Sequence, residues 1–173
     1  MNESTEKWCL LIRAVSFQQI DKIVPALVQE YPGMKLAILT HAHGRDMAAG
    51  YGEVDEVLVY PEVGSFDPAK VPEAVRSRRW DTVVAPVANV SGSGFYNVLR
   101  FSLAIPARQH VQINLPGQLS PLTSAGLMAT GARNGAFTLL AALAAALLWL
   151  PWLIVFSLMA LFVPHKREEL GPG

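Results

Sequence analysis

The fold is decided by residues 9–21, which read CLLIRAVSFQQID. The compact apolar run at their start suits a buried strand, and the turn AVSFQQ leads from it into a helical pattern. A strand, a turn and a helix in this order open a nucleotide-binding domain. This turn contains no glycine, although a loop that cradles phosphate needs glycine so that backbone amides can approach closely. The stretch therefore predicts the fold and leaves open whether the turn binds a ligand.

Strand-like and helix-like patterns alternate along residues 8–116. The further strand-like runs are LAILT (36–40), VDEVLVYP (54–61), DTVVAPV (81–87) and QHVQIN (109–114). Helical patterns cover residues 18–33, 67–80 and 94–104. Continuous apolar strands that alternate with helices indicate a parallel sheet covered on both faces. We therefore predict an α/β fold: a single Rossmann-like, doubly wound parallel sheet domain of about five strands.

Residues 135–163 form an uncharged and almost entirely apolar segment, and they are the main source of the mean hydropathy of +0.30. About 20 apolar residues suffice to cross a bilayer, so this segment is long enough to span one with tilt. The alternative is a buried core helix, but apolar residues cover every face of this segment, and the residues that follow it could not cover them. We predict one C-terminal transmembrane helix, followed by a polar tail at residues 164–173.

The predicted span carries bulky and small side chains near its middle. Pro151 should kink the helix, and Trp149 and Trp152 flank the bend. Ala142 and Ala145 on the preceding turns would allow another helix to approach closely. We expect these five residues to pack against neighbouring spans. The alternative is that alanine and proline are simply common in membrane helices.

Charge and cysteine content exclude several classes of protein. Lys and Arg number 14, as do Asp and Glu, so no basic excess indicates a nucleic-acid partner. The single cysteine, Cys9, excludes an internal disulfide and fits a reducing compartment. Residues 1–7 are polar and are expected to be flexible, and no secretory signal opens the chain.

Two rules give opposite orientations for the span. Lys166 and Arg167 follow it, which would place the C-terminus in the cytoplasm. That orientation would require export of the N-terminal domain without a signal, a larger barrier than one extra charge. We therefore expect a bacterial inner membrane, cytoplasmic or intracytoplasmic, with the N-terminal domain on the cytoplasmic side.

Several motifs carry a resemblance to a known family. The runs LLIRAVSFQQIDKIVPALVQEYPGMKLAILT, YGEVDEVLVYP and VPEAVRSRRWDTVVAPV resemble the N-terminal half of heptosyltransferase-like glycosyltransferases, family 9 of GT-B architecture. That family has an iRlsslGD turn, a vDevi strand and an LR.rryDlvid junction. Here Val54-Asp55-Glu56-Val57 and Arg78-Arg79-Trp80-Asp81 match the last two. The segment GFYNVLRFSLAIPARQHVQIN is similar to the helix and strand that follow, so the resemblance covers residues 8–116.

Two departures from the family affect its expected chemistry. The family's Gly-Asp is replaced by Ile20-Asp21, so the acid remains but the close backbone approach that glycine permits is lost. The second GT-B domain, which in the family holds the sugar nucleotide, is replaced by the predicted membrane span. The resemblance therefore implies a half-domain that cannot complete a reaction in a two-domain cleft.

The residues considered for ligand contact come from two turns. Ser16, Gln18, Gln19 and Asp21 belong to the first turn and helix, and Ser91 and Ser93 belong to the glycine-rich loop SGSG. That loop precedes a helix and could hold an anion, but it lacks the lysine of a P-loop, and a plain strand–helix turn is the alternative. His41 and His43 are interpreted as solvated loop histidines, because their spacing without a third ligand makes a poor metal site. We expect no catalytic residue, metal or cofactor.

Residues 117–134 contain several prolines and glycines and are expected to form an extended linker, docked on a partner or disordered. The first functional hypothesis is a non-catalytic single-span structural or docking subunit of a larger bacterial membrane complex, such as a photosynthetic or respiratory assembly. Its partners would be the bilayer and other membrane subunits, contacted through span, linker and domain. The alternatives are the membrane-anchored half of a split glycosyltransferase, and a nucleotide-sugar-binding or nucleotide-sensing protein.

Overall fold

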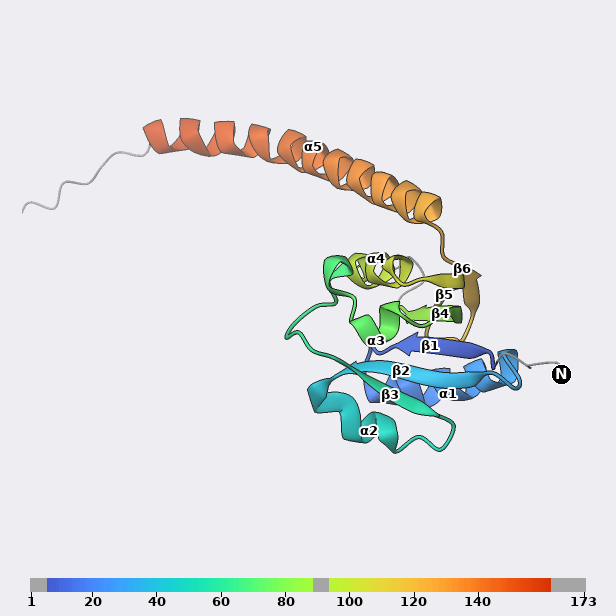
Figure 1. Ribbon diagram of the computed structural model, residues 1–173. Coiled ribbons are helices and arrows are strands. Elements are labelled where there is room, and N and C mark those ends of the chain that lie inside the picture. Colours follow the sequence, from blue (N-terminus) through green and yellow to red (C-terminus); the bar gives the residue numbers. More distant parts are fainter. Residues whose placement is uncertain (1–5, 89–93, 163–173) are drawn as a thin grey trace, which may run out of the picture. The chain divides into compact units, whose positions relative to one another are not determined.

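The computed structural model describes residues 6–88 and 94–162 (Figure 1). Residues 1–5, Ser91 and Ser93, and the predicted polar tail lie outside the described residues. The chain divides into two units, Met1–Ala129 and Thr130–Gly173, and each is described by itself.

The first unit is built on a six-stranded sheet in the order β3-β2-β1-β4-β5-β6. The elements in chain order are β1 (Trp8–Ile12), α1 (Phe17–Glu30), β2 (Lys35–His41), η1 (Ala42–Gly44), α2 (Arg45–Ala49), β3 (Glu56–Tyr60), η2 (Pro68–Lys70), α3 (Glu73–Arg76), β4 (Trp80–Pro86), α4 (Tyr96–Ala104), β5 (Ala107–Ile113), β6 (Leu119–Pro121) and α5 (Ser124–Phe162). Strands β1 to β5 are parallel, and β6 runs antiparallel to β5. The chain winds outward from β1 in both directions, so the predicted Rossmann-like α/β fold is confirmed.

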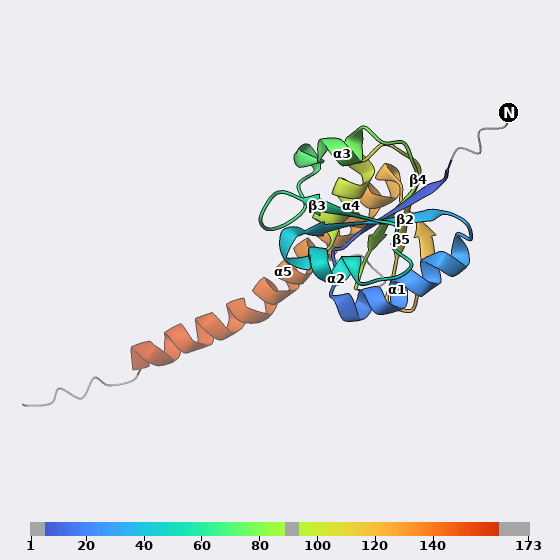
Figure 2. The ribbon, with the colours of Figure 1, turned by 60° about the horizontal axis from the view of Figure 1, so that its bottom comes forward.

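Helices cover both faces of the sheet, as its apolar strands require (Figure 2). Alternate residues of β1 point to opposite faces: Leu11 packs with Ile20 of α1, whereas Leu10 packs with Phe101 of α4. Helices α1 and α2 lie on one face and α3 and α4 on the other. Each strand of the centre is therefore buried on both sides, which explains the continuous apolar runs in the sequence.

Asp55 and Asp81 belong to the two motifs that resemble the heptosyltransferase-like family. Both have structural roles at the amino ends of the parallel strands. Asp55 Oδ2 accepts from the Leu36 N–H at 2.8 Å, and Asp81 Oδ2 accepts from the Trp8 N–H at 3.0 Å. Each carboxylate satisfies a backbone donor of the neighbouring strand, which would otherwise lack a partner at the strand's start. These acids therefore hold strand ends together.

Trp80 anchors the same edge from within the core. Its side chain is fully buried, and its Nε1–H donates to the Val75 carbonyl oxygen at 2.8 Å. Trp8 meets it edge-on with ring centroids 6.3 Å apart. The Arg78 guanidinium lies over both rings and pairs with Glu56. The RRWD motif thus joins α3, β3 and β4 through one aromatic and cationic cluster.

The helix predicted at residues 67–80 is wrong. The chain there forms the short η2 and α3, and β4 already begins at Trp80. Val71, between the two short helices, is extended with φ −63° and ψ 123°, because the ring of Pro72 disfavours a helical residue before it. Val71 and Val75 are buried as expected for an inward-facing pair.

The extended linker predicted at residues 117–134 is also wrong. Strand β6 adds to the edge of β5, and α5 begins at Ser124. Leu122 and Leu127 are both 7% exposed and pack with Leu99 of α4. The core contacts of these two leucines and the pairing of β6 with β5 order a segment whose composition is typical of a loop. The compact unit therefore extends to Ala129 rather than to residue 116.

The N-terminal boundary differs in a smaller way. Within the stretch predicted to be flexible, Glu6 pairs with Lys35 at 2.8 Å, and the Lys7 carbonyl oxygen accepts from the Lys35 N–H at 2.9 Å. The described end of that stretch is therefore held against β2.

Helix α5 runs from Ser124 to Phe162, so it begins earlier than the predicted span. Within its part Ser124–Met159, an 18-residue window has a mean hydropathy of 2.4, and none of that window is buried within the structure. Among the described residues it is the one helix long and apolar enough to cross a membrane. Pro151 lies inside it, and Trp149 and Trp152 are 69% and 61% exposed. The apolar helix predicted from the sequence is present.

Cys9 should stay unreactive while the domain is folded. It is 2% exposed in β1, and burial raises the pKa of its thiol from 9.0 to about 12. Since only the thiolate is a good nucleophile, iodoacetamide at pH 8 should label Cys9 only when the domain opens, and rapidly in urea. The unfolded thiol loses its proton at lower pH than the folded one, so the stability that this group contributes declines as pH rises above 9.0. Fast labelling of the folded chain would contradict its placement in the core.

Candidate functional site

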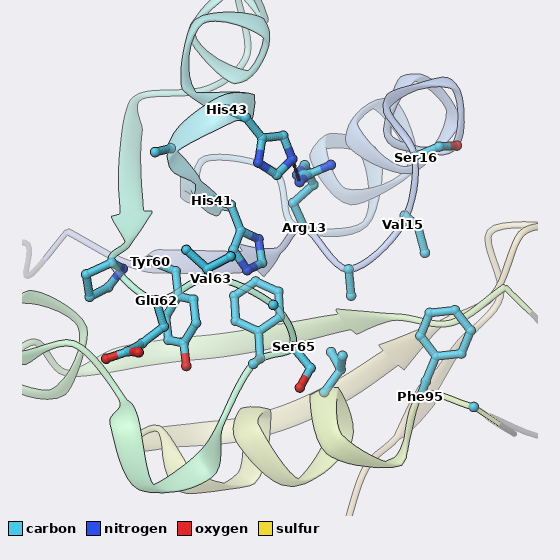
Figure 3. A pocket seen from close by; sticks show the side chains of 17 residues that line it. Arg13, Val15, Ser16, His41, His43, Tyr60, Glu62, Val63, Ser65 and Phe95 are labelled. Carbon is cyan, nitrogen blue, oxygen red and sulfur yellow. Dashed lines mark hydrogen bonds between the residues drawn. The ribbon is translucent and has the colours of Figure 1, made fainter.

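A cavity of about 630 Å³ lies at the carboxyl edge of the parallel strands (Figure 3). Its walls are the turns that follow β1, β2 and β3 and the start of α4. In open α/β sheets, ligands bind outside the carboxyl ends of the strands, at the point where the strand order reverses. That point lies here between β1 and β4, so the cavity is where a ligand of this fold is expected.

Arg13, the first residue after β1, lies in the centre of this cavity wall (Figure 3). Its Nε–H donates to Thr40 Oγ1 at 2.8 Å, and Thr40 is fully buried at the end of β2. The guanidinium carbon also lies 4.9 Å from the ring centroid of Phe17 in α1. The side chain is therefore held by two elements while it lines the cavity.

Gly44 makes this position of Arg13 possible. A Cβ atom at Gly44 would lie 2.5 Å from Thr40 Oγ1 and 3.2 Å from Arg13 Nε. The first distance is shorter than any real contact, so a larger residue would displace the hydrogen bond between the two side chains. The glycine of the THAHG segment thus serves close packing around Arg13.

Two histidines lie beside the guanidinium, both from the end of β2 and the η1 turn. Arg13 Nη2 lies 3.0 Å from His43 Nε2. Because a guanidinium can only donate, His43 Nε2 must accept, and its ring is then neutral with the proton on Nδ1. The His41 ring stacks on His43 with centroids 5.7 Å apart and packs against Tyr60 and Phe66.

His41 contains an unusual buried atom. Its Nε2 is inaccessible to solvent and has no hydrogen-bond partner among the described residues. Burial is the main cause that lowers the pKa of His41 below 6.5, a contact with the Gly64 backbone opposes the shift, and the nearby Arg13 charge adds to it. The ring is therefore neutral at pH 7. The interpretation of both histidines as solvated loop residues holds only for the exposed His43.

The cavity wall contains one positive side chain, Arg13, and one acidic side chain, Glu62. No ion pair among the described residues involves Arg13. Glu62, the acidic residue of the wall, pairs with Lys70 at 2.9 Å. The guanidinium is thus a positive charge without a compensating carboxylate in the part of the chain that the structure describes.

The residues predicted for ligand contact have different positions. Ser16 borders the cavity at the N-terminus of α1, and its N–H donates to Gln19 Oε1 at 3.3 Å, which stabilises the helix start. Gln18 is exposed and is not part of the cavity wall. Asp21 accepts a hydrogen bond from the Tyr51 hydroxyl. Burial and this bond raise the pKa of Tyr51 to about 12, so the phenol remains a donor.

Sequence reasoning missed Arg13 as a member of the site. Arg13 directly follows β1, and the end of this strand brings it to the cavity. The signal was present in the LLIR run, but an arginine after a strand is not distinctive by itself. Among the described residues no group of three or more His, Cys, Asp or Glu side chains is placed to hold a metal ion.

The strand order and the cavity at its carboxyl edge define a Rossmann-like α/β protein that also carries one long apolar helix. No protein-family model matches the chain, and no curated protein sequence does. Among solved structures, the chain is similar to the E. coli heptosyltransferase WaaC with ADP, at 15% identity and a TM-score of 0.42. The similar region covers 62% of this chain and 34% of that enzyme, so the chain spans about a third of its structural neighbour.

Proposed function

We propose that this chain is a non-catalytic single-span subunit of a bacterial membrane complex, in which the α/β domain serves as a structural or docking module on the cytoplasmic side. The observation that carries the proposal is the apolar window of α5, none of which is buried within the described residues. Lipid or other membrane subunits must cover such a surface, because water cannot do so without a large cost.

The middle of α5 has a surface hollow that suits the packing of a neighbouring helix. Leu148, Trp149, Trp152, Leu153 and Phe156 enclose an apolar hollow of about 430 Å³ on the helix surface. The rings of Trp152 and Phe156 are 6.1 Å apart and form one rigid side of it. Large aromatic side chains on either side of Pro151 favour specific helix packing over uniform contact with lipid. This supports a fixed partner in the membrane, whether a photosynthetic or a respiratory assembly.

The first helix supports a non-catalytic domain. Ile20 stands where the heptosyltransferase-like motif has glycine, and it is fully buried in the core beside Leu11 and Ile23. Asp21, where that motif has its acid, is bonded to Tyr51. The position that would bring backbone amides to a ligand therefore stabilises the core, and the adjacent acid is engaged in a tertiary contact.

The test is a gentle detergent extraction from native membranes, affinity capture of the full chain and mass spectrometry of what accompanies it. We expect a set of membrane subunits in a fixed ratio. The matched control replaces residues 135–159 by an unrelated leucine–alanine span of equal length, which should keep the chain in the membrane and lose the subunits. A native chain that is monomeric in mild detergent and captures no partner would overturn the proposal.

A second function, the membrane-anchored half of a split glycosyltransferase or a nucleotide-sugar-binding protein, is favoured by one observation, the cavity at the carboxyl edge of the sheet. The same capture distinguishes the two functions. A single soluble partner that binds a sugar nucleotide would support the split enzyme, and an array of membrane subunits would exclude it.

A further inference from the structure

We propose that the cavity at the carboxyl edge is a binding site for a phosphate group, held by the terminal nitrogens of Arg13 with the help of His43. This inference is independent of whether the chain is a subunit of a complex. It rests on the position of the guanidinium, on the charge around it and on the size of the cavity.

The guanidinium is placed before any ligand arrives. Its Nε edge is occupied by Thr40 at 2.8 Å, and its face lies 4.9 Å from the Phe17 centroid. The other edge carries the two terminal nitrogens, of which Nη2 contacts His43 at 3.0 Å. An arginine edge of this kind binds two oxygens of one anion side by side once the neutral partner gives way. An arginine fixed in this way loses little conformational entropy on binding.

The neighbouring groups fit an anion and do not compete with it. Glu62 is paired with Lys70, and no described carboxylate pairs with Arg13. Partly buried positive charge without a counter-ion is costly, and an anionic ligand removes that cost.

His43 can exchange its bond to Arg13 for a bond to the ligand. It is exposed, and it accepts from Arg13 Nη2 through one imidazole nitrogen. When an anion takes the Arg13 Nη2 donor, a ring N–H of His43 can donate to the same anion. Two donor side chains in one place, one of them a guanidinium, suit a phosphate group with its several acceptor oxygens better than a carboxylate, which has two.

The cavity is larger than a phosphate ion alone requires. Its volume of about 630 Å³ lies within the usual range for small-molecule sites. Phe66 and Phe95 contribute apolar surface to its wall. The phosphate therefore belongs to a larger molecule, either a soluble phosphate ester or the headgroup of an anionic lipid in the membrane that holds α5.

The experiment is equilibrium dialysis of radiolabelled inorganic phosphate against the full chain in a neutral, phosphate-free detergent. We expect saturable binding that weakens roughly tenfold or more in Arg13→Gln, the scale of losing hydrogen bonds to a charged group. Arg13→Lys keeps the charge without the two-pronged edge and should fall between the two. The matched control is Arg108→Gln, which removes the same charge at the opposite edge of the sheet, where Arg108 lies 3.4 Å from Asp81, and it should bind as the native chain does.

Further arms separate a local effect from misfolding and identify the source of the phosphate. Gly44→Ala keeps every charge but displaces Arg13 from Thr40, so it should also weaken binding, and Cys9 labelling verifies that each variant is folded. Competition by phosphatidic acid in phosphatidylcholine nanodiscs would assign the site to a lipid headgroup, whereas competition only by glycerol phosphate in solution would assign it to a soluble ester. Absence of saturable binding, equal loss in Arg108→Gln, or equal competition by acetate would overturn the proposal.

Discussion

Replacement of Trp80 by alanine should lower the free energy of unfolding of the α/β domain by about 3–5 kcal/mol, the range observed for large aromatic residues removed from a core. Trp80 is fully buried and contributes the largest side chain among the fully buried residues. Its removal leaves a void in the core cluster that also contains Phe101 and Ile105, and it takes away one of the two rings on which the Arg78 guanidinium lies. It also removes the donor to the Val75 carbonyl oxygen.

The measurement is a urea series in which a short pulse of thiol reagent labels Cys9, with far-UV circular dichroism as the second probe. Cys9 lies in β1, which pairs with β4 through the register Cys9 to Thr82, so it reports the opening of the strand pair next to Trp80. Trp80→Phe is the control, because it keeps most of the ring volume and loses the N–H bond, and its effect should be clearly smaller. An alanine variant as stable as the native chain would mean that Trp80 does not belong to the core.

Two arginines introduced into α5, Leu147→Arg with Ile154→Arg, should release the chain from the membrane. Both positions lie within the apolar segment and are 75% and 54% exposed, so none of the described residues shields them fully. Each arginine at the centre of a span opposes insertion by about 2.5–3.5 kcal/mol. The double variant should therefore move from the carbonate-resistant membrane pellet toward the soluble or degraded fraction.

Met128→Arg is the matched control for this pair. Met128 is also exposed, at 70%, and lies in the same helix, but it precedes the uncharged segment of residues 135–163. This single change should leave the chain in the pellet. A double variant that stays in the membrane pellet would mean that α5 is covered by protein rather than by lipid.

The sequence alone determined the class of the domain and the presence of the apolar helix, because both are properties of residues near one another in the chain. Leu10 and Leu11 alternate between two buried faces, and this is visible as a continuous apolar run without knowledge of the partners. The length of residues 135–163 and their lack of charge likewise require no tertiary information.

Only the tertiary structure decided where the chain departs from the secondary structure that its local sequence pattern predicts. The strand β6 and the early start of α5 depend on the open edge of β5 and on the core contacts of Leu122 and Leu127. The site depends on even longer connections, since Arg13 meets Thr40 and His43 across 27 and 30 positions of sequence. Parallel strands bring their carboxyl ends to one edge whatever the spacing between them. The absence of glycine from the first turn therefore did not decide whether this end of the sheet binds a ligand. The positive charge at the cavity belongs to Arg13, which directly follows β1 and precedes that turn.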